Sequence, residues 1–141
     1  MLGAGLLVAC AAPPERPALP PDVRVPQGRT PFGDRTMQAD VWAWAGVFDR
    51  LKPGHPRLRV TPYHLPVGVS AASLKAYYDR ILLTRGWRER PELARQDGRA
   101  WAFGYGQGRY VYAVVGLEPQ YAVMGVRPLN ILTDLPAPAS P

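Results

Sequence analysis

The sequence predicts an α+β fold: an antiparallel sheet of three to four strands, with one main helix at about residues 70–85 packed on one face. Two observations support this prediction. One segment combines helical spacing of its apolar residues with signals for a helix start and a helix stop, and three later segments have the alternation typical of β-strands. An antiparallel meander must bury one of its faces, and an amphipathic helix supplies the cover.

The helix at 70–85 has the most complete set of signals. Five apolar side chains at i, i+3, i+4, i+7 and i+8 form one stripe: Leu74, Tyr77, Tyr78, Ile81 and Leu82. Ser70 is a typical N-cap, because its hydroxyl can accept a hydrogen bond from an unpaired N–H of the first turn. Gly86 suits the left-handed residue that ends a helix, and we expect Trp87 to fold back onto Leu82 in a Schellman motif.

The segment at 36–51 has two interpretations. Helical spacing relates five of its apolar residues: Met37, Val41, Trp44, Phe48 and Leu51. Small and β-branched residues also alternate with Trp42 and Trp44, and this alternation would suit a strand. We favour a second helix at 36–51, which Pro53 and Pro56 would end in either case.

Strands are expected on both sides of the main helix. Residues 57–65 alternate as a strand, and Pro62 within it predicts an edge strand or a bulge, because proline cannot donate to a ladder. After the helix we expect a short strand at 87–89, a polar connection at 91–98, and longer strands at 99–105, 109–117 and 121–127.

The first ten residues, MLGAGLLVAC, end in the only cysteine of the chain. Leu7-Val8-Ala9-Cys10 resembles the lipobox of bacterial lipoproteins, in which the cysteine is acylated and the chain is cut before it. This resemblance implies a protein anchored in a lipid membrane through acylated Cys10, in the cell envelope, facing the periplasm or the exterior. The domain organisation follows: a short or truncated signal segment at 1–9, a proline-rich tether at 10–31, one α+β domain at 32–135 and a disordered tail at 136–141.

Residues of the main helix also carry a resemblance. Tyr77-Tyr78, Leu82 and Gly86-Trp87 resemble a YY…L…GW motif of small secreted or lipid-anchored bacterial domains of unknown function, over about residues 57–127. The resemblance implies that these five residues form a structural clamp between helix and sheet. It brings no catalytic residues.

No catalytic, cofactor or metal site is predicted. The two histidines, His55 and His64, lack the further ligands at fixed spacing that a metal site needs. There is no Gly-x-Ser-x-Gly motif, and Ser70 is explained as a helix cap. The glycines at 104–108 join two expected strands, so we interpret them as a hairpin turn and not as a phosphate-binding loop.

Aromatic residues are the best lead to a function. Four Trp and seven Tyr exceed what one helix-on-sheet core needs. If one aromatic row faces outwards, it would form an interaction surface for a partner protein or a glycan. The candidate residues are Trp101, Phe103, Tyr105, Tyr110 and Tyr112. The alternative is that segment 32–56 covers the second face of the sheet.

Three functions remain open. The first is a non-enzymatic, membrane-anchored envelope lipoprotein that binds another envelope protein or a glycan. The second is a ligand-binding or enzymatic envelope domain with a pocket, for example with His64 near Asp79. The third is surface binding of DNA or another anionic polymer, for which the net charge of +6 is the argument. Because the basic residues are spread along the chain, nucleic acid is not the favoured partner.

Overall fold

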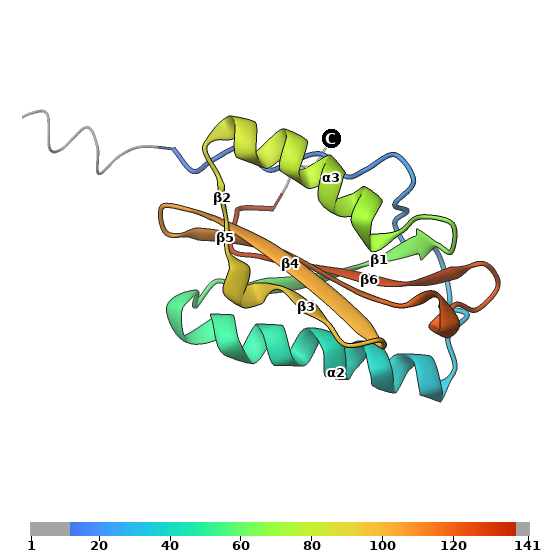
Figure 1. Cartoon of the computed structure of the whole chain (residues 1–141). Helices are drawn as coiled ribbons and strands as arrows, with labels where there is room; N and C mark the ends of the chain where they lie inside the picture. Colours follow the sequence, from blue (N-terminus) through green and yellow to red (C-terminus); the bar gives the residue numbers. More distant parts are fainter. Residues whose placement is uncertain (1–11, 138–141) are drawn as a thin grey trace, which may run out of the picture.

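The computed structural model describes residues 12–137, which form two long helices and six strands (Figure 1). The elements in chain order are α2 (Asp34–Leu51), β1 (Arg59–Pro66), α3 (Ala71–Leu82), β2 (Arg88–Glu89), β3 (Arg95–Gln96), β4 (Ala100–Gln107), β5 (Tyr110–Leu117) and β6 (Val126–Thr133). Cys10, the segment at 1–9 and residues 138–141 lie outside the described residues. Within the described part, no helix combines the length and the apolar character needed to cross a membrane.

All strands belong to one antiparallel sheet of order β1-β6-β5-β4-β2, with β3 also paired to β4. The predicted α+β class is confirmed, and the number of strands is higher than the three to four expected. β2 corresponds to the short strand expected at 87–89, whereas β3 lies in the segment expected as a polar connection at 91–98. Both are two-residue strands that pair one after the other along the outer edge of β4.

Helices cover both faces of the sheet, with α3 on one side and α2 on the other (Figure 1). The core beneath α3 is rich in aromatic side chains: Tyr63, Tyr78, Trp87, Trp101, Phe103, Tyr105 and Tyr112. The core beneath α2 is mainly aliphatic: Ala43, Val47, Leu51, Leu58, Leu93, Ala102, Val111, Ala113, Val115, Leu117 and Leu132. Strand alternation sends neighbouring residues of β4 and β5 to these two different cores.

The segment at 36–51 is helical, as we favoured, but α2 faces the sheet with a different stripe. Its buried residues recur at helical spacing and are mostly small: Thr36, Asp40, Ala43, Val47 and Leu51. Trp44 and Phe48 pack at the side of this core, whereas Met37 and Val41 are 36% and 46% exposed. The small side chains therefore face the sheet, and the larger apolar ones lie beside it or in solvent.

The ends of α3 have the hydrogen bonds that the sequence predicts. Ser70 Oγ accepts from the backbone N–H of Ser73 at 3.0 Å. At the other end a 3₁₀ turn, Leu83–Arg85, leads to Gly86, whose φ of 88° is left-handed. The N–H of Trp87 donates to the carbonyl of Leu82 at 3.0 Å, which closes a Schellman motif. Trp87 is thereby turned into the core, where it is 2% exposed.

The last long strand, β6, covers Val126–Thr133 and not the expected 121–127, so it begins five and ends six residues later than we expected. Residues 119–121 form a 3₁₀ turn, and Met124 and Gly125 both have positive φ. Within β6, the polar residues Arg127, Asn130 and Thr133 interrupt the apolar pattern, and the side chain of each has a hydrogen-bond partner in another element. The buried guanidinium of Arg127, for example, donates to the carbonyls of Leu117, Pro66, Val67 and Val69.

The proline-rich segment differs from the tether that we expected at 10–31. Residues 17–24, here called the N-terminal strap, pack against α3 and β1. Val23 is 7% exposed and belongs to the core beneath α3, and Arg24 forms a two-hydrogen-bond bridge with His64 of β1. Tyr77 Oη donates to the carbonyls of Ala18 and Leu19 at 2.9 and 3.2 Å. The strap is therefore part of the folded domain, which does not begin at residue 32.

Candidate functional site

A hollow of about 650 Å³ lies at the end of the sheet where β1 and β5 begin and β6 ends. Its volume is in the range of small-molecule sites, roughly 300–1,000 Å³. It is lined by Gly54, Pro56, Arg57, Arg59, Arg109, Tyr110, Asp134, Leu135, Pro136 and Ala137. We call it the arginine pocket, because Arg57, Arg59 and Arg109 are its cationic side chains.

Strand pairing brings these residues together from three distant parts of the chain. In the β1–β6 ladder Arg59 is opposite Thr133, so Asp134 directly follows the paired end of β6. Thr133 is also opposite Tyr112 of β5, and the turn before β5 carries Arg109. Arg57 lies in the turn that the N–H of Leu58 closes by donating to the carbonyl of His55, and Arg59 is the first residue of β1. Both residues line the hollow.

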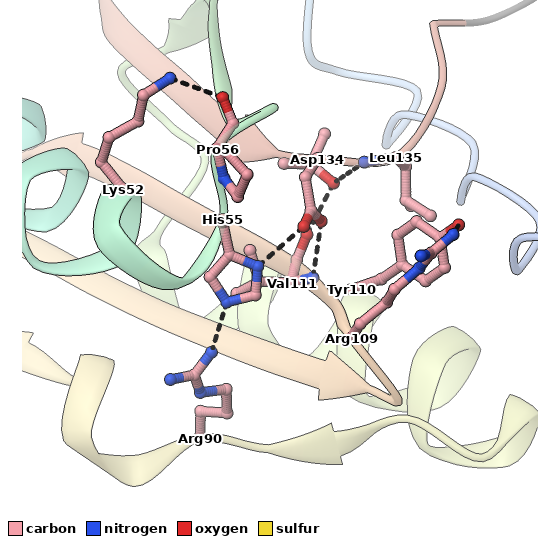
Figure 2. Close-up of polar contacts among 10 residues, drawn as sticks. Lys52, His55, Pro56, Arg90, Arg109, Tyr110, Val111, Asp134 and Leu135 are labelled. Atoms are coloured by element: carbon pink, nitrogen blue, oxygen red, sulfur yellow. Dashed lines mark hydrogen bonds and ion pairs between the residues drawn. The ribbon is translucent and has the colours of Figure 1, made fainter.

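Asp134 is the acidic group of the pocket, and both of its carboxylate oxygens have partners (Figure 2). Oδ1 accepts from the backbone N–H of Val111 at 2.9 Å, and Oδ2 lies 2.7 Å from Nδ1 of His55. The two side chains are only 10% and 13% exposed. Asp134 therefore connects the loop around His55 to the end of the sheet, and both of its carboxylate oxygens contact groups of the protein.

The other ring nitrogen of His55 also has a neighbour. Because an ionised carboxylate only accepts hydrogen bonds, the proton shared with Asp134 belongs to Nδ1. The lone pair of Nε2 then faces Nη1 of Arg90, at 3.4 Å. Figure 2 shows the imidazole between Asp134 and the Arg90 guanidinium. Both nitrogens are engaged within the protein, and His55 does not line the pocket.

The arginines of the pocket are exposed and have few internal partners. Arg109 lies over the ring of Tyr110, with 5.3 Å from Cζ to the ring centroid, and donates to Tyr110 Oη at 3.3 Å. Among residues 12–137, no ion pair or hydrogen bond involves the side chains of Arg57 and Arg59. Three arginine residues thus line a hollow whose one carboxylate already contacts a backbone amide and a histidine.

The aromatic surface expected from the sequence is not exposed. Trp101, Phe103, Tyr105 and Tyr112 are between 0% and 4% exposed beneath α3, and α2 covers the opposite face. Tyr112 Oη donates to Tyr78 Oη at 3.3 Å, and Tyr105 Oη donates to Asp79 at 2.6 Å, so their hydroxyls have internal partners too. The expectation that these four residues form an exposed interaction surface is therefore wrong. Of the five candidates only Tyr110, which is half-buried, reaches the arginine pocket.

The proposed proximity of His64 and Asp79 is wrong as well. His64 pairs with Arg24 through the backbone, and its ring lies 5.2 Å from that of Phe32. Asp79 instead contacts Tyr105 and Lys75. His55, and not His64, contacts a carboxylate. Residues 12–137 contain no group of three His, Cys, Asp or Glu side chains that could hold a metal ion.

The residues of the arginine pocket were not singled out from the sequence. Arg57 and Arg59 could have been noticed as one charged side of a predicted edge strand. Asp134 and Arg109 offered no local signal, since their positions depend on which strands pair. Another exposed side chain missed in this way is Trp42, which is 65% exposed on α2 beneath the guanidinium of Arg95.

Comparisons with protein-family models, with curated proteins and with solved structures find no match for this chain.

Proposed function

We propose that this protein is a lipid-anchored, non-enzymatic binding domain of the bacterial cell envelope, and that its arginine pocket binds an anionic group of the ligand. The observation that carries the proposal is the convergence of Arg57, Arg59 and Arg109 on one hollow. Guanidinium groups bind phosphate and carboxylate oxygens through paired, charge-assisted hydrogen bonds. A phosphate, sulfate or carboxylate group is therefore the ligand chemistry that fits.

Binding is favoured over catalysis by the state of His55. A general base needs a ring nitrogen within hydrogen-bond reach of the proton that it removes. Nδ1 of His55 is 2.7 Å from Asp134, and Nε2 points to Arg90 and not into the pocket. The hydroxyl of Tyr110, which lines the pocket, accepts from Arg109, and the hydroxyl of Thr133 at the end of β6 donates to the carbonyl of Val111 and accepts from the N–H of Leu135. The His–Asp pair is then a structural tie between the loop and β6.

The membrane anchor is supported by Leu7-Val8-Ala9-Cys10. Each acyl CH₂ buried in a bilayer contributes about 0.8 kcal/mol, so several acyl chains hold a protein at a membrane. The partner in the envelope would be a protein or a glycan with anionic groups. The anchor is tested by labelling cells with a fatty-acid analogue: Cys10→Ala should abolish both labelling and membrane fractionation, and unchanged labelling would rule the anchor out.

The pocket is tested by titrating the protein with inorganic pyrophosphate in a calorimeter. The triple variant R57Q/R59Q/R109Q should bind at least about tenfold more weakly, since each charge-assisted hydrogen bond contributes roughly 1.5–3 kcal/mol. The matched control is R29Q/R35Q/R99Q, which removes the same charge elsewhere on the exposed surface. If both triple variants lose equal affinity, the pocket has no special role.

The same pair of variants addresses binding of DNA or another anionic polymer. Affinity that depends only on total charge would fall equally in both variants and would decrease steeply with salt. Such a result would replace the pocket by dispersed surface charge as the binding determinant. A loss confined to the pocket variant would support the site.

A further inference from the structure

The N-terminal strap leads the chain away from the domain at the end that carries the arginine pocket. Before the strap, Glu15 lies beside the C-terminal end of α3, with its carboxylate 3.8 Å from the guanidinium of Arg85. The backbone carbonyl of Arg85 in turn accepts from the side chain of Gln107 at 3.1 Å. Gln107 is the last residue of β4, two residues before Arg109.

Figure 1 shows the same arrangement, with the start of the described chain next to the C-terminal end of α3 and to the β4–β5 hairpin. The hairpin carries Arg109 and Tyr110 to the pocket. Leu135, which belongs to the core beneath α3, also lines the pocket. The exit of the N-terminal chain and the arginine pocket are therefore features of one end of the molecule.

The chain between this end and Cys10 is short. Cys10 precedes Ala12 by two residues and Glu15 by five. An extended chain spans at most about 3.6 Å per residue, so Cys10 is within roughly 18 Å of Glu15. The headgroup region on each side of a bilayer is about 5–8 Å thick. Because the strap is packed on the domain, an acyl group on Cys10 would bring this end to the membrane surface.

We propose that the end of the molecule formed by Arg57, Arg59 and Arg109 docks on the phosphate groups of anionic phospholipids in the membrane that the acyl chains of Cys10 enter. This inference rests on the proposed function, because it names the anionic ligand of the same pocket. The membrane anchor holds the pocket among headgroup phosphates. The domain would then lie on the bilayer with a fixed orientation, and the start of β1 and the end of β6 would face the lipid.

The charges and the apolar groups at this end fit an anionic membrane surface. Asp134, the carboxylate of the pocket, is engaged by His55 and the Val111 amide. Each basic residue near an anionic bilayer contributes about 1 kcal/mol of attraction. Leu83, which is 45% exposed in the turn after α3, adds an apolar side chain next to the chain exit.

The test uses the full chain with Cys10→Ala, so that docking is measured without acyl chains. Co-sedimentation is measured with vesicles of phosphatidylglycerol and phosphatidylcholine, and with vesicles of phosphatidylcholine alone. We expect binding only to the vesicles with phosphatidylglycerol. In this background R57Q/R59Q/R109Q should weaken binding by at least about tenfold, given roughly 1 kcal/mol for each removed charge. The control R29Q/R35Q/R99Q should change it by less than about twofold, because its charges lie away from the pocket.

The outcomes separate this inference from the proposed function. If R57Q/R59Q/R109Q loses pyrophosphate binding but keeps vesicle binding, docking on lipid is wrong and the anion pocket stands. If it keeps both, docking and pocket are both wrong. Equal losses of vesicle binding in the two triple variants would also overturn docking through this end. Thermal unfolding of each variant confirms that the comparison is made on folded protein, and R57Q/R59Q alone serves if the triple variant does not fold.

Discussion

Asn130 of β6 donates a hydrogen bond from Nδ2 to Oδ1 of Asp40 on α2 at 2.6 Å, and both side chains are buried. Burial raises the pKa of Asp40 to about 6, and the hydrogen bond from Asn130 only partly offsets this effect. In the unfolded chain the pKa returns to its ordinary value of 3.8. The folded protein therefore favours the protonated form of Asp40 more strongly than the unfolded chain does.

The stability of the protein should decrease as Asp40 ionises. A carboxyl with a raised pKa contributes stability that is complete below the unfolded pKa and is lost as the pH rises through the folded pKa, here from about pH 4 to about pH 6. The loss is on the order of 3 kcal/mol. Asp40→Asn keeps an acceptor for Asn130 but cannot ionise. Urea unfolding should show the variant more stable than the wild type at pH 8, with the difference shrinking towards pH 4.

The control for this prediction is Asp49→Asn, an exposed position of the same helix. Its effect on the free energy of unfolding should be small at both pH values. A difference between wild type and Asp40→Asn that is equal at pH 4 and pH 8 would show that Asp40 does not titrate in this range.

Gly116 of β5 is required because the ring of Trp101 lies directly on it. A Cβ at this position would overlap three carbon atoms of the indole. Gly116→Ala should therefore reduce the free energy of unfolding by about 1–3 kcal/mol, the usual cost of overpacking a core. Gly46→Ala is the control: a Cβ on this exposed face of α2 meets no atom within 4 Å, and alanine should stabilise the helix by up to about 1 kcal/mol. A neutral Gly116→Ala would mean that Trp101 can move aside without loss.

Trp87 closes the end of α3 and fills the core beneath it. Trp87→Ala should cost about 3–5 kcal/mol of unfolding free energy, as for other large-to-small changes in a core. Trp87→Phe should cost less than Trp87→Ala, since it keeps a ring that leaves a smaller cavity and removes Nε1–H, a buried donor with no partner among the described residues. Both values can be measured by denaturant unfolding. The control is Trp42→Ala, because Trp42 is exposed and its loss should cost less than about 1 kcal/mol. A cost that small for Trp87→Ala would contradict the role of Trp87 as a buried clamp between helix and sheet.

The N-terminal strap offers a pair of matched valines. Val23 is 7% exposed and Val25, two residues later, is 63% exposed. Val23→Ala should lower the free energy of unfolding by about 1–3 kcal/mol, whereas Val25→Ala should change it by less than about 0.5 kcal/mol. Limited proteolysis gives a second measurement, because Val23→Ala should make the strap more accessible. Equal effects of the two substitutions would mean that the strap is an unpacked tether after all.

Parts of the fold with local signals could be predicted from the sequence. Ser70 and Gly86 mark the ends of a helix by chemistry within a few residues, and the alternation in β4 and β5 needs no knowledge of the rest of the chain. The bounds of β6 could not be predicted: apolar residues at 121–123 suggested an earlier start, and Arg127 and Asn130, whose partners come from other elements, interrupt the pattern within the strand. Likewise, prolines in the strap suggested a tether, although Pro17 and Pro20 are buried.

The candidate site was less predictable than the fold, because its residues are separated by long stretches of sequence. Arg59 and Asp134 become neighbours only through pairing of β1 with β6, and Arg109 joins them through the β4–β5 turn. Trp101 and Phe103, by contrast, were expected on an interaction surface and are buried. Alternation correctly placed them on one face, but which faces the helices cover is a property of the complete fold.

The sheet order has a consequence for how the chain acquires its structure. Within the sheet, β1 pairs only with β6, the last strand to be synthesised, and Arg59 is opposite Thr133. Such a distant pairing makes folding slow, because a long loop must close before any contact is gained. A chain that leaves the ribosome or a translocation channel N-terminus first therefore holds residues 59–66 without their partner strand until residues 126–133 have emerged. The domain must fold after its emergence is complete, and a product truncated before residue 126 would expose an unpaired strand that is prone to aggregate.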